Sequence, residues 1–283
     1  MAEFSTIEWT KHTANLWWGC TKVSDGCDHC YAENMARRWG NNVWGNDNPR
    51  KQIKSFTADL LKYQRAAKKA NTIDKVFVGS MMDIFEKPMP LVDSKGKLLD
   101  KTTGDLRAEF FENISQGLYP NLMFLMLTKR PSNINKYIPE AWKITPPANV
   151  MFGTSPCNQL TAMTLIEQLL QVKGSKFLSV EPQLAEITLL PWLQLGQIDW
   201  VIQGGESGPN KRAFNTDWAR KLKAECQATG TAYFFKQIDK VKQIPNDLMI
   251  REYPMKVFGC GLKGACSSKR SKQGVETGFQ LVI

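Results

Sequence analysis

The sequence predicts an α/β protein, an incomplete or irregular (β/α) TIM-like barrel with parallel strands. Short apolar runs recur along the chain, and amphipathic stretches with helical periodicity separate them. The composition, 42% hydrophobic and 23% charged over 283 residues, is that of a globular protein with a sizeable core. In folds of this class, functional sites gather at the carboxyl ends of the strands, so the residues after each run are the first candidates.

The predicted strands are continuous apolar runs, which indicates that the sheet is covered on both faces. They span residues 75–81, 122–127, 150–154, 177–180, 198–203 and 232–235. The predicted helices place apolar side chains at a spacing of four on one face. They span residues 57–70, 106–118, 158–172 and 216–228, and a further helix starts at residues 31–39, after the cysteines. This alternation favours βαβ units.

Two regions interrupt the alternation. Residues 90–105 are rich in Asp, Lys and Gly and are typical of a surface insertion, such as a hairpin. The chain from residue 241 has a different composition, with Cys260, Cys266 and a basic run at residues 269–272. We therefore expect a barrel domain over residues 1–240 and a C-terminal extension of unknown role over residues 241–283.

The net charge of +10 favours a polyanionic partner such as nucleic acid or a nucleotide, with a solvated basic surface as the alternative. Residues 37–75 mix basic side chains with Trp39, Trp44 and Tyr63, a composition suited to stacking on bases. No apolar run is long enough to span a bilayer, and residues 1–13 are polar and mixed in sign. The sequence thus predicts a cytoplasmic protein with no membrane contact.

A cluster of three cysteines is the strongest functional signal. Cys20, Cys27 and Cys30 lie within eleven residues, in a loop that contains Gly19 and Gly26. The chain has seven cysteines and no export signal, which argues against a disulfide framework. Thiolates suit an iron–sulfur cluster or zinc.

The number of cysteines favours the cluster over zinc. A structural zinc site needs four ligands, and the fourth would have to be His29, Cys260 or Cys266. A [4Fe–4S] cluster held by three cysteines leaves one iron open to a cofactor or substrate.

The triplet resembles that of radical S-adenosylmethionine enzymes. Their usual spacing is Cys-x3-Cys-x2-Cys, whereas this chain has Cys-x6-Cys-x2-Cys. The resemblance covers roughly residues 6–237 and extends to a phage and bacterial radical-SAM-like family of unassigned reaction. The matching pieces are IEWT (7–10), GCTKVS (19–24), CYAE (30–33), LTKRP (127–131), SVEP (179–182), GGESG (204–208) and FFKQ (234–237).

The resemblance implies that S-adenosylmethionine binds the open iron and that its reductive cleavage releases a 5′-deoxyadenosyl radical. It also implies an electron donor such as flavodoxin. His29 occupies the position where the family often has an aromatic residue near the adenine, and Tyr31 follows the last cysteine. Ser80 and Asp83 follow the first strand, where the family binds the cofactor's amino group. For Asp83 a helix N-cap or turn is the alternative.

Further candidates follow the later strands. Arg130 is expected to bind a carboxylate or phosphate, unless it is a surface arginine. Glu181 lies in an apolar segment and needs a partner, from among Lys129, Arg130, Lys236 or the cofactor ribose. Lys236 itself is expected to face the substrate.

The glycine-rich loop Gly204-Gly205-Glu206 is expected to hold a phosphate or the cofactor, with an ordinary turn as the alternative.

The sequence therefore predicts a radical S-adenosylmethionine enzyme that acts on a nucleotide or a nucleic-acid base. Two alternatives stay open: a non-catalytic, zinc-stabilised nucleic-acid-binding protein, and an iron–sulfur redox sensor. The reaction type and the catalytic residues are not indicated by the sequence.

Overall fold

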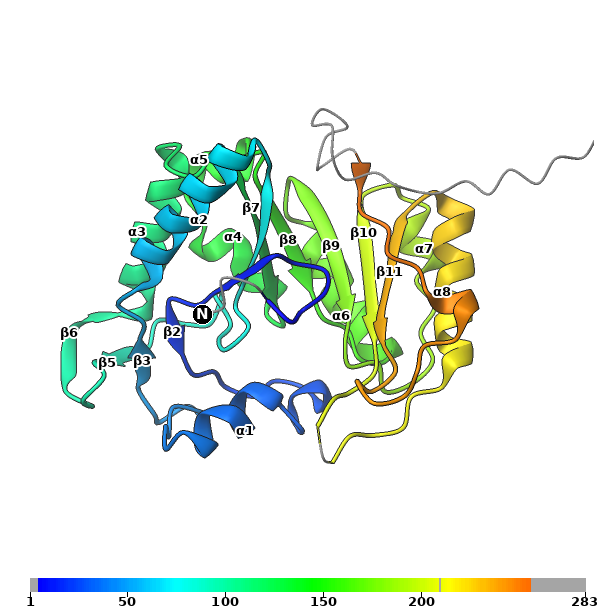
Figure 1. Cartoon of the computed structure of the whole chain (residues 1–283), viewed down its shortest axis with the longest axis horizontal. Helices are drawn as coiled ribbons and strands as arrows, with labels where there is room; N and C mark the ends of the chain where they lie inside the picture. Colours follow the sequence, from blue (N-terminus) through cyan, green and yellow to red (C-terminus); the bar gives the residue numbers. More distant parts are fainter. Residues whose placement is uncertain (1–4, 209, 256–283) are drawn as a thin grey trace, which may run out of the picture.

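A seven-stranded parallel sheet, curled into a half barrel, organises the chain in the computed structural model, which describes residues 5–208 and 210–255 (Figure 1). The strands pair in the order β1-β4-β7-β8-β9-β10-β11, so every neighbour in the sheet is also the next strand of this sheet along the chain. They are β1 (His12–Ala14), β4 (Asp74–Val78), β7 (Leu122–Thr128), β8 (Val150–Thr154), β9 (Ser175–Val180), β10 (Trp200–Gly204) and β11 (Ala232–Gln237). The strands' carboxyl ends consequently meet at one edge of the sheet.

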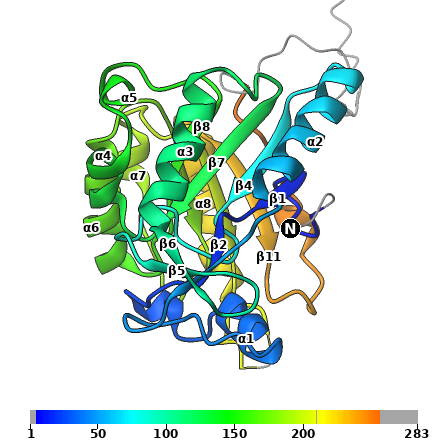
Figure 2. The same cartoon turned by 90° about the vertical axis from the view of Figure 1, so that its left-hand side faces the viewer.

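Helices cover the convex face of the sheet (Figures 1 and 2). They are α2 (Phe56–Ala70), α3 (Thr103–Ser115), α4 (Ile134–Tyr137), α5 (Glu140–Ile144), α6 (Gln159–Leu170), α7 (Leu190–Leu193) and α8 (Thr216–Thr229), with 3-10 turns at Asp25–Cys27, Pro131–Asn133 and Asn246–Leu248. Helix α1 (Tyr31–Arg38) lies apart from them, across the end of the sheet where the strands finish (Figure 1).

Both faces of the sheet are covered, as the continuous apolar runs predicted. In β7, Phe124 and Met126 pack under the helices, whereas Met123 and Leu125 point to the concave side. The concave side has its own buried cluster, centred on the aromatic rings. Its buried members are Trp9, Phe77, Met123, Leu125, Met151, Phe177, Trp200, Ile202 and Phe234. Burial of each such side chain contributes about 1.5–3 kcal/mol.

The six predicted strands and the predicted helices are confirmed, with shifts at their ends. Strand β4 stops at Val78, earlier than expected, because Gly79 adopts a φ of 110°. Helix α3 begins at Thr103 because Thr102 and Asp105 form a capping box. Strand β1 was not predicted; it is only three residues long.

The predicted insertion forms an antiparallel hairpin of β5 (Pro90–Val92) and β6 (Leu98–Thr102). The hairpin belongs to a second sheet, in which β5 pairs with β3 (Arg50–Gln52) and β3 with β2 (Trp17–Trp18). This small sheet connects the segment before the cysteines to the segment after β4.

Residues after 240 continue to pack on the sheet as far as they are described. Leu248 is buried in the main core, and Trp200 donates its indole N–H to the Glu252 carbonyl at 2.9 Å. The division at residue 240 stays a prediction. Cys260, Cys266 and the basic run at 269–272 lie outside the described residues. Across residues 5–208 and 210–255, no helix has the length and apolar character that crossing a membrane requires.

We predict that Gly153→Ala destabilises the protein by about 1–3 kcal/mol, because a core that is already filled must be overpacked. A Cβ at residue 153 of β8 would lie 2.4 Å from Cε1 and Cζ of Phe177, its neighbour on β9. Urea unfolding monitored by tryptophan fluorescence measures the loss. Phe177→Leu is the matched control, since it removes the colliding ring. The double variant should lose less than the sum of the two single losses, and simple additivity would contradict the collision.

Candidate functional site

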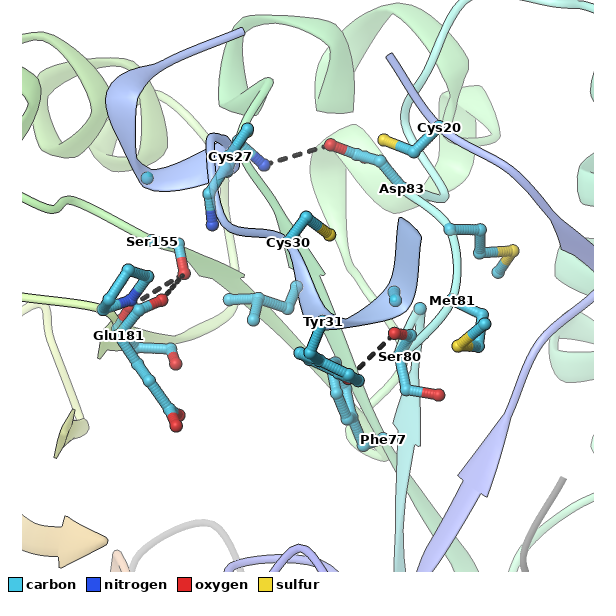
Figure 3. A pocket seen from close by; sticks show the side chains of 18 of the residues that line it. Cys20, Cys27, Cys30, Tyr31, Phe77, Ser80, Met81, Asp83, Ser155 and Glu181 are labelled. Atoms are coloured by element: carbon cyan, nitrogen blue, oxygen red, sulfur yellow. Dashed lines mark hydrogen bonds between the residues drawn. The ribbon is translucent and has the colours of Figure 1, made fainter. Parts of the chain in front are cut away.

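A cavity of about 650 Å³ lies at the carboxyl ends of the strands, bounded by the sheet and by the segment that carries the cysteines (Figure 3). Trp9 and Phe77 of the concave cluster form part of its lining. The cavity brings together almost every residue that the sequence analysis selected. Cys20, Cys27, His29, Cys30, Tyr31, Ser80, Asp83, Arg130, Glu181, Gly205, Glu206 and Lys236 line it, and Gly204 is buried behind it. Its size is that of sites for cofactor-sized ligands.

The cysteine segment enters the cavity through a close contact at Gly19. The Gly19 N–H donates to the Met81 carbonyl at 3.1 Å, and φ of Gly19 is 117°. A Cβ there would lie 2.2 Å from the Val43 carbonyl oxygen and 2.6 Å from Cδ of Arg50. Only glycine therefore allows Cys20 to follow directly after β2 beside the ends of the strands.

A buried ion pair between Arg50 and Glu86 supports the start of the cysteine loop. Their side chains are 0% and 2% exposed, and Arg50 donates to the carboxylate from Nε at 2.9 Å and from Nη2 at 2.7 Å. Nη2 also donates to the Thr21 hydroxyl at 2.9 Å. Nη1 donates to the carbonyls of Val43, Gly45 and Asn48. One guanidinium thus connects the cysteine loop to residues 43–48 and to the segment after β4.

Arg130 lies next to this pair and contacts Cys20 directly. Its Nη1 lies 2.8 Å from the Asp83 carboxylate and 3.7 Å from Sγ of Cys20, and Nη2 donates to the Thr21 carbonyl at 2.5 Å. Asp83 also accepts from the Thr128 hydroxyl at 2.7 Å and from the Lys129 N–H at 3.1 Å. Arg130 thus pairs with the carboxylate of Asp83 in the same chain, and its expected contact with a cofactor or substrate stays a prediction.

The pKa values of this group follow from burial and charge. Burial, with a smaller effect of Asp83, raises the pKa of Cys20 to about 12, although Arg130 opposes the rise. Burial alone would lower the pKa of Arg130, but Asp83, Cys20 and Glu86 raise it above its usual range. In the protein without metal, Arg130 is consequently charged and Cys20 is a thiol.

A second set of contacts holds the later part of the loop. Glu206 accepts from Nη2 of Arg212 at 2.7 Å and lies 3.1 Å from Nδ1 of His29. Arg212 also donates to the Asp25 carbonyl at 3.0 Å. Burial tends to raise the pKa of Glu206, but the hydrogen bonds from Arg212 and His29 outweigh it and lower the pKa. His29 and Glu206 thus bind each other, and the sequence analysis did not select Arg212.

Gly204, the last residue of β10, and Gly205 after it have structural roles that need no bound phosphate. The Gly205 N–H donates to the Gln237 carbonyl at 3.0 Å, so it is used inside the sheet. A Cβ at Gly205 would lie 2.0 Å from the Ile238 carbonyl oxygen. The Gly204 carbonyl accepts from the Gln183 N–H at 3.0 Å.

Glu181 lies on the side of the cavity opposite Cys20 and Asp83 (Figure 3). Glu181 forms an ion pair with Lys236, which identifies its partner among the four that the sequence left open. Their side chains are 16% and 12% exposed, and both line the cavity. Between the two walls, the Tyr31 hydroxyl donates to the Ser80 carbonyl at 2.9 Å and so attaches α1 to the sheet.

The three thiols of the cysteine loop line the cavity together. Cys20, Cys27 and Cys30 are half-buried and form no disulfide. Over residues 5–208 and 210–255, no three His, Cys, Asp or Glu side chains converge on a point that could hold one metal ion. Cysteines that hold a cubane bind different irons and need not converge in this way. Cys157 and Cys226 are buried free cysteines outside the loop.

We predict that Glu86→Gln destabilises the protein by about 3–5 kcal/mol, because Arg50 is left as an uncompensated buried charge. Urea unfolding of the metal-free chain measures this loss. The matched control is Lys101→Gln, which breaks the exposed pair with Glu109 and should cost less than about 1 kcal/mol. Equal effects of the two substitutions would show that the buried pair has no special role.

The comparisons with known proteins identify a family but no function. No curated protein and no solved structure matches the chain. A family model, described as a protein of unknown function (DUF5131), matches residues 4–274. Since that match covers nearly the whole sequence, the chain belongs to the DUF5131 family.

Proposed function

We propose that the protein is a radical S-adenosylmethionine enzyme, built on an incomplete TIM-like barrel, that holds a [4Fe–4S] cluster on Cys20, Cys27 and Cys30. One observation carries the proposal: three thiols from a single eleven-residue loop line one cavity at the carboxyl ends of a parallel sheet. When bound, the reduced cluster and S-adenosylmethionine supply a 5′-deoxyadenosyl radical, so the hard chemistry belongs to the cofactors. A one-electron donor such as flavodoxin would be a partner.

The chain's own residues position the cysteines and balance their charge. A guanidinium beside a cysteine sulfur stabilises the thiolate, and Arg130 is 3.7 Å from Sγ of Cys20. Asp83 holds Arg130 in this position, and the Arg50–Glu86 pair holds the backbone around Thr21. These contacts exist before a cluster binds, so the loop is preorganised on the Cys20 side.

The opposite wall offers charges of both signs to a zwitterionic cofactor. Glu181 suits an amino group or a ribose hydroxyl, and Lys236 suits a carboxylate. Each would exchange its present partner for the cofactor group, so no unpaired charge would be left. Trp9 and Phe77 close the apolar side of the cavity and keep water from that part of the site.

We predict that anaerobic reconstitution with iron and sulfide gives a brown protein that cleaves S-adenosylmethionine to 5′-deoxyadenosine after reduction. Cys27→Ala should abolish the product, because a cubane needs its third thiolate. Cys226→Ala is the matched control: this thiol is buried in α8, away from the loop, and its removal should leave cleavage intact. Chromatographic quantification of 5′-deoxyadenosine is the measurement.

The other outcomes separate the alternatives. A cluster that forms without any cleavage, also in the presence of nucleotides and oligonucleotides, would favour a redox sensor. Tightly bound zinc in place of the cluster would overturn the proposal.

We also predict that Arg130→Gln lowers the midpoint potential of the cluster, because a positive charge and a hydrogen bond to the Cys20 sulfur are lost. A redox titration followed by electron paramagnetic resonance measures the shift. Arg130→Lys keeps the positive charge, so its midpoint potential should lie between those of Arg130→Gln and the unaltered protein. An unchanged potential in both variants, at full iron content, would mean that Arg130 does not act on the cluster.

A further inference from the structure

Helix α1 presents an exposed apolar stripe to the cavity. Tyr31, Met35 and Trp39 follow one another at a spacing of four, and their side chains share one side of the helix and of the turn after it. They are 44%, 37% and 56% exposed, and all three line the cavity. Ala32 and Ala36, on the adjacent side of α1, are buried in a small apolar cluster with Val43, Trp44 and Met81. The large side chains of this helix are therefore turned toward the cavity rather than into a core.

Trp39 is held in place by a second indole. Its ring stacks on Trp18 of β2, with the centroids 5.2 Å apart and the planes inclined by 24°. Trp18 also lines the cavity. One indole supports the other, and more than half of the Trp39 surface stays open. A rigid, exposed aromatic surface of this kind is typical of sites that stack on a flat ligand.

The charges around the stripe favour an anionic ligand. Each carboxylate that lines the cavity has a cationic partner, as Asp83 with Arg130 and Glu181 with Lys236 show. Glu206 is likewise paired, with Arg212. Lys129 and Lys240 also line the cavity. Neither lysine forms an ion pair with a carboxylate among the described residues. The unbalanced charge of the cavity is therefore positive.

A second, smaller hollow adjoins the stripe. It measures about 250 Å³ and shares Tyr31 and Met35 with the cavity. Its lining includes the polar side chains of Asn34, Arg38 and Ser207, together with the carboxylate of Asp28. The stripe thus separates the large cavity from a small hollow that offers the guanidinium of Arg38. The two spaces together can take more than one unit of a polymeric ligand.

We propose that this stripe stacks on a base of a single-stranded nucleic acid, with neighbouring phosphates bound by Arg38 and Lys240. Two hollows on one stripe favour a strand over a free nucleotide. That the stacked base is also the substrate rests on the proposed function; the binding itself does not. Single-stranded DNA and RNA present the same base and phosphate chemistry here, so both belong in the test.

The test is fluorescence anisotropy of a labelled ten-nucleotide oligothymidylate, and of its RNA counterpart, with the full-length reconstituted protein. Binding should weaken as salt increases. Trp39→Ala should weaken it roughly 5- to 150-fold, the range for loss of one stacked base, and Trp39→Phe should restore part of it. Leu160→Ala is the matched control, because Leu160 is a 73% exposed apolar residue on α6, and it should change nothing. Arg38→Gln should weaken binding and reduce the salt dependence.

Three results would overturn the proposal: no binding of either oligomer at low salt, full binding by Trp39→Ala, or competition by thymidine monophosphate as effective as that of the oligomer. S-adenosylmethionine binding should be measured in parallel. If Trp39→Ala loses binding of S-adenosylmethionine and not of the oligomer, the stripe belongs to the cofactor site. Cleavage of S-adenosylmethionine without oligomer binding contradicts only this inference. Oligomer binding without cleavage contradicts only the proposed function.

Discussion

The buried ion pair of Arg50 and Glu86 is the interaction on which the site depends. Two charges removed from water are costly unless their hydrogen bonds are complete, and Arg50 uses its whole guanidinium to meet that condition. Its partners come from the cysteine loop, from residues 43–48 and from the segment after β4. The same segments also share a small apolar cluster that includes Val43, Trp44 and Met81, so the charged centre and this cluster together fix where they meet. The position of Cys20 is a consequence of both.

The cysteine loop is held by charged contacts at two places. Arg130 fixes the Cys20 end, and the Glu206–Arg212 pair fixes the part around Asp25 and His29. Both clamps are charged and both begin where a strand finishes, so the sheet determines the spacing between them. A loop fixed in this way can surround a group of definite size, which a flexible cysteine segment would have to order on binding. The longer first gap between the cysteines spans the distance between the two clamps.

The strands were predictable because a strand covered on both faces must be apolar throughout, and Asp83, Arg130 and Glu181 were found because they follow such runs. Their partners were not predictable in the same way. Arg50 and Glu86 are separated by 36 residues and lie in segments without periodicity, and Arg212 follows a glycine-rich loop that gave no reason to select it. Long-range ion pairs leave no local pattern, so sequence reasoning selected residues that line one cavity but misjudged how many of them are paired with one another. Of the aromatic residues noted from composition, only Trp39 belongs to the stripe, since Trp44 and Tyr63 are buried; the stripe itself became visible only in the helix.

A sheet of seven strands that curls without closing cannot cover its own concave face. In this protein the segment before β4 lies over part of that face (Figure 1). The aromatic cluster around Trp9 and Phe77 fills the inner part of that face, so the space that remains lies between the strand ends and residues 18–44. The cysteines and the aromatic stripe therefore come from one short stretch of chain, Trp18 to Trp39, anchored by the same contacts. Under the proposed function, any movement of that stretch changes the cluster and the base-binding surface together. Binding of a single-stranded nucleic acid to the stripe would then favour the loop conformation that holds the cluster. The cluster would favour nucleic-acid binding by the same free energy.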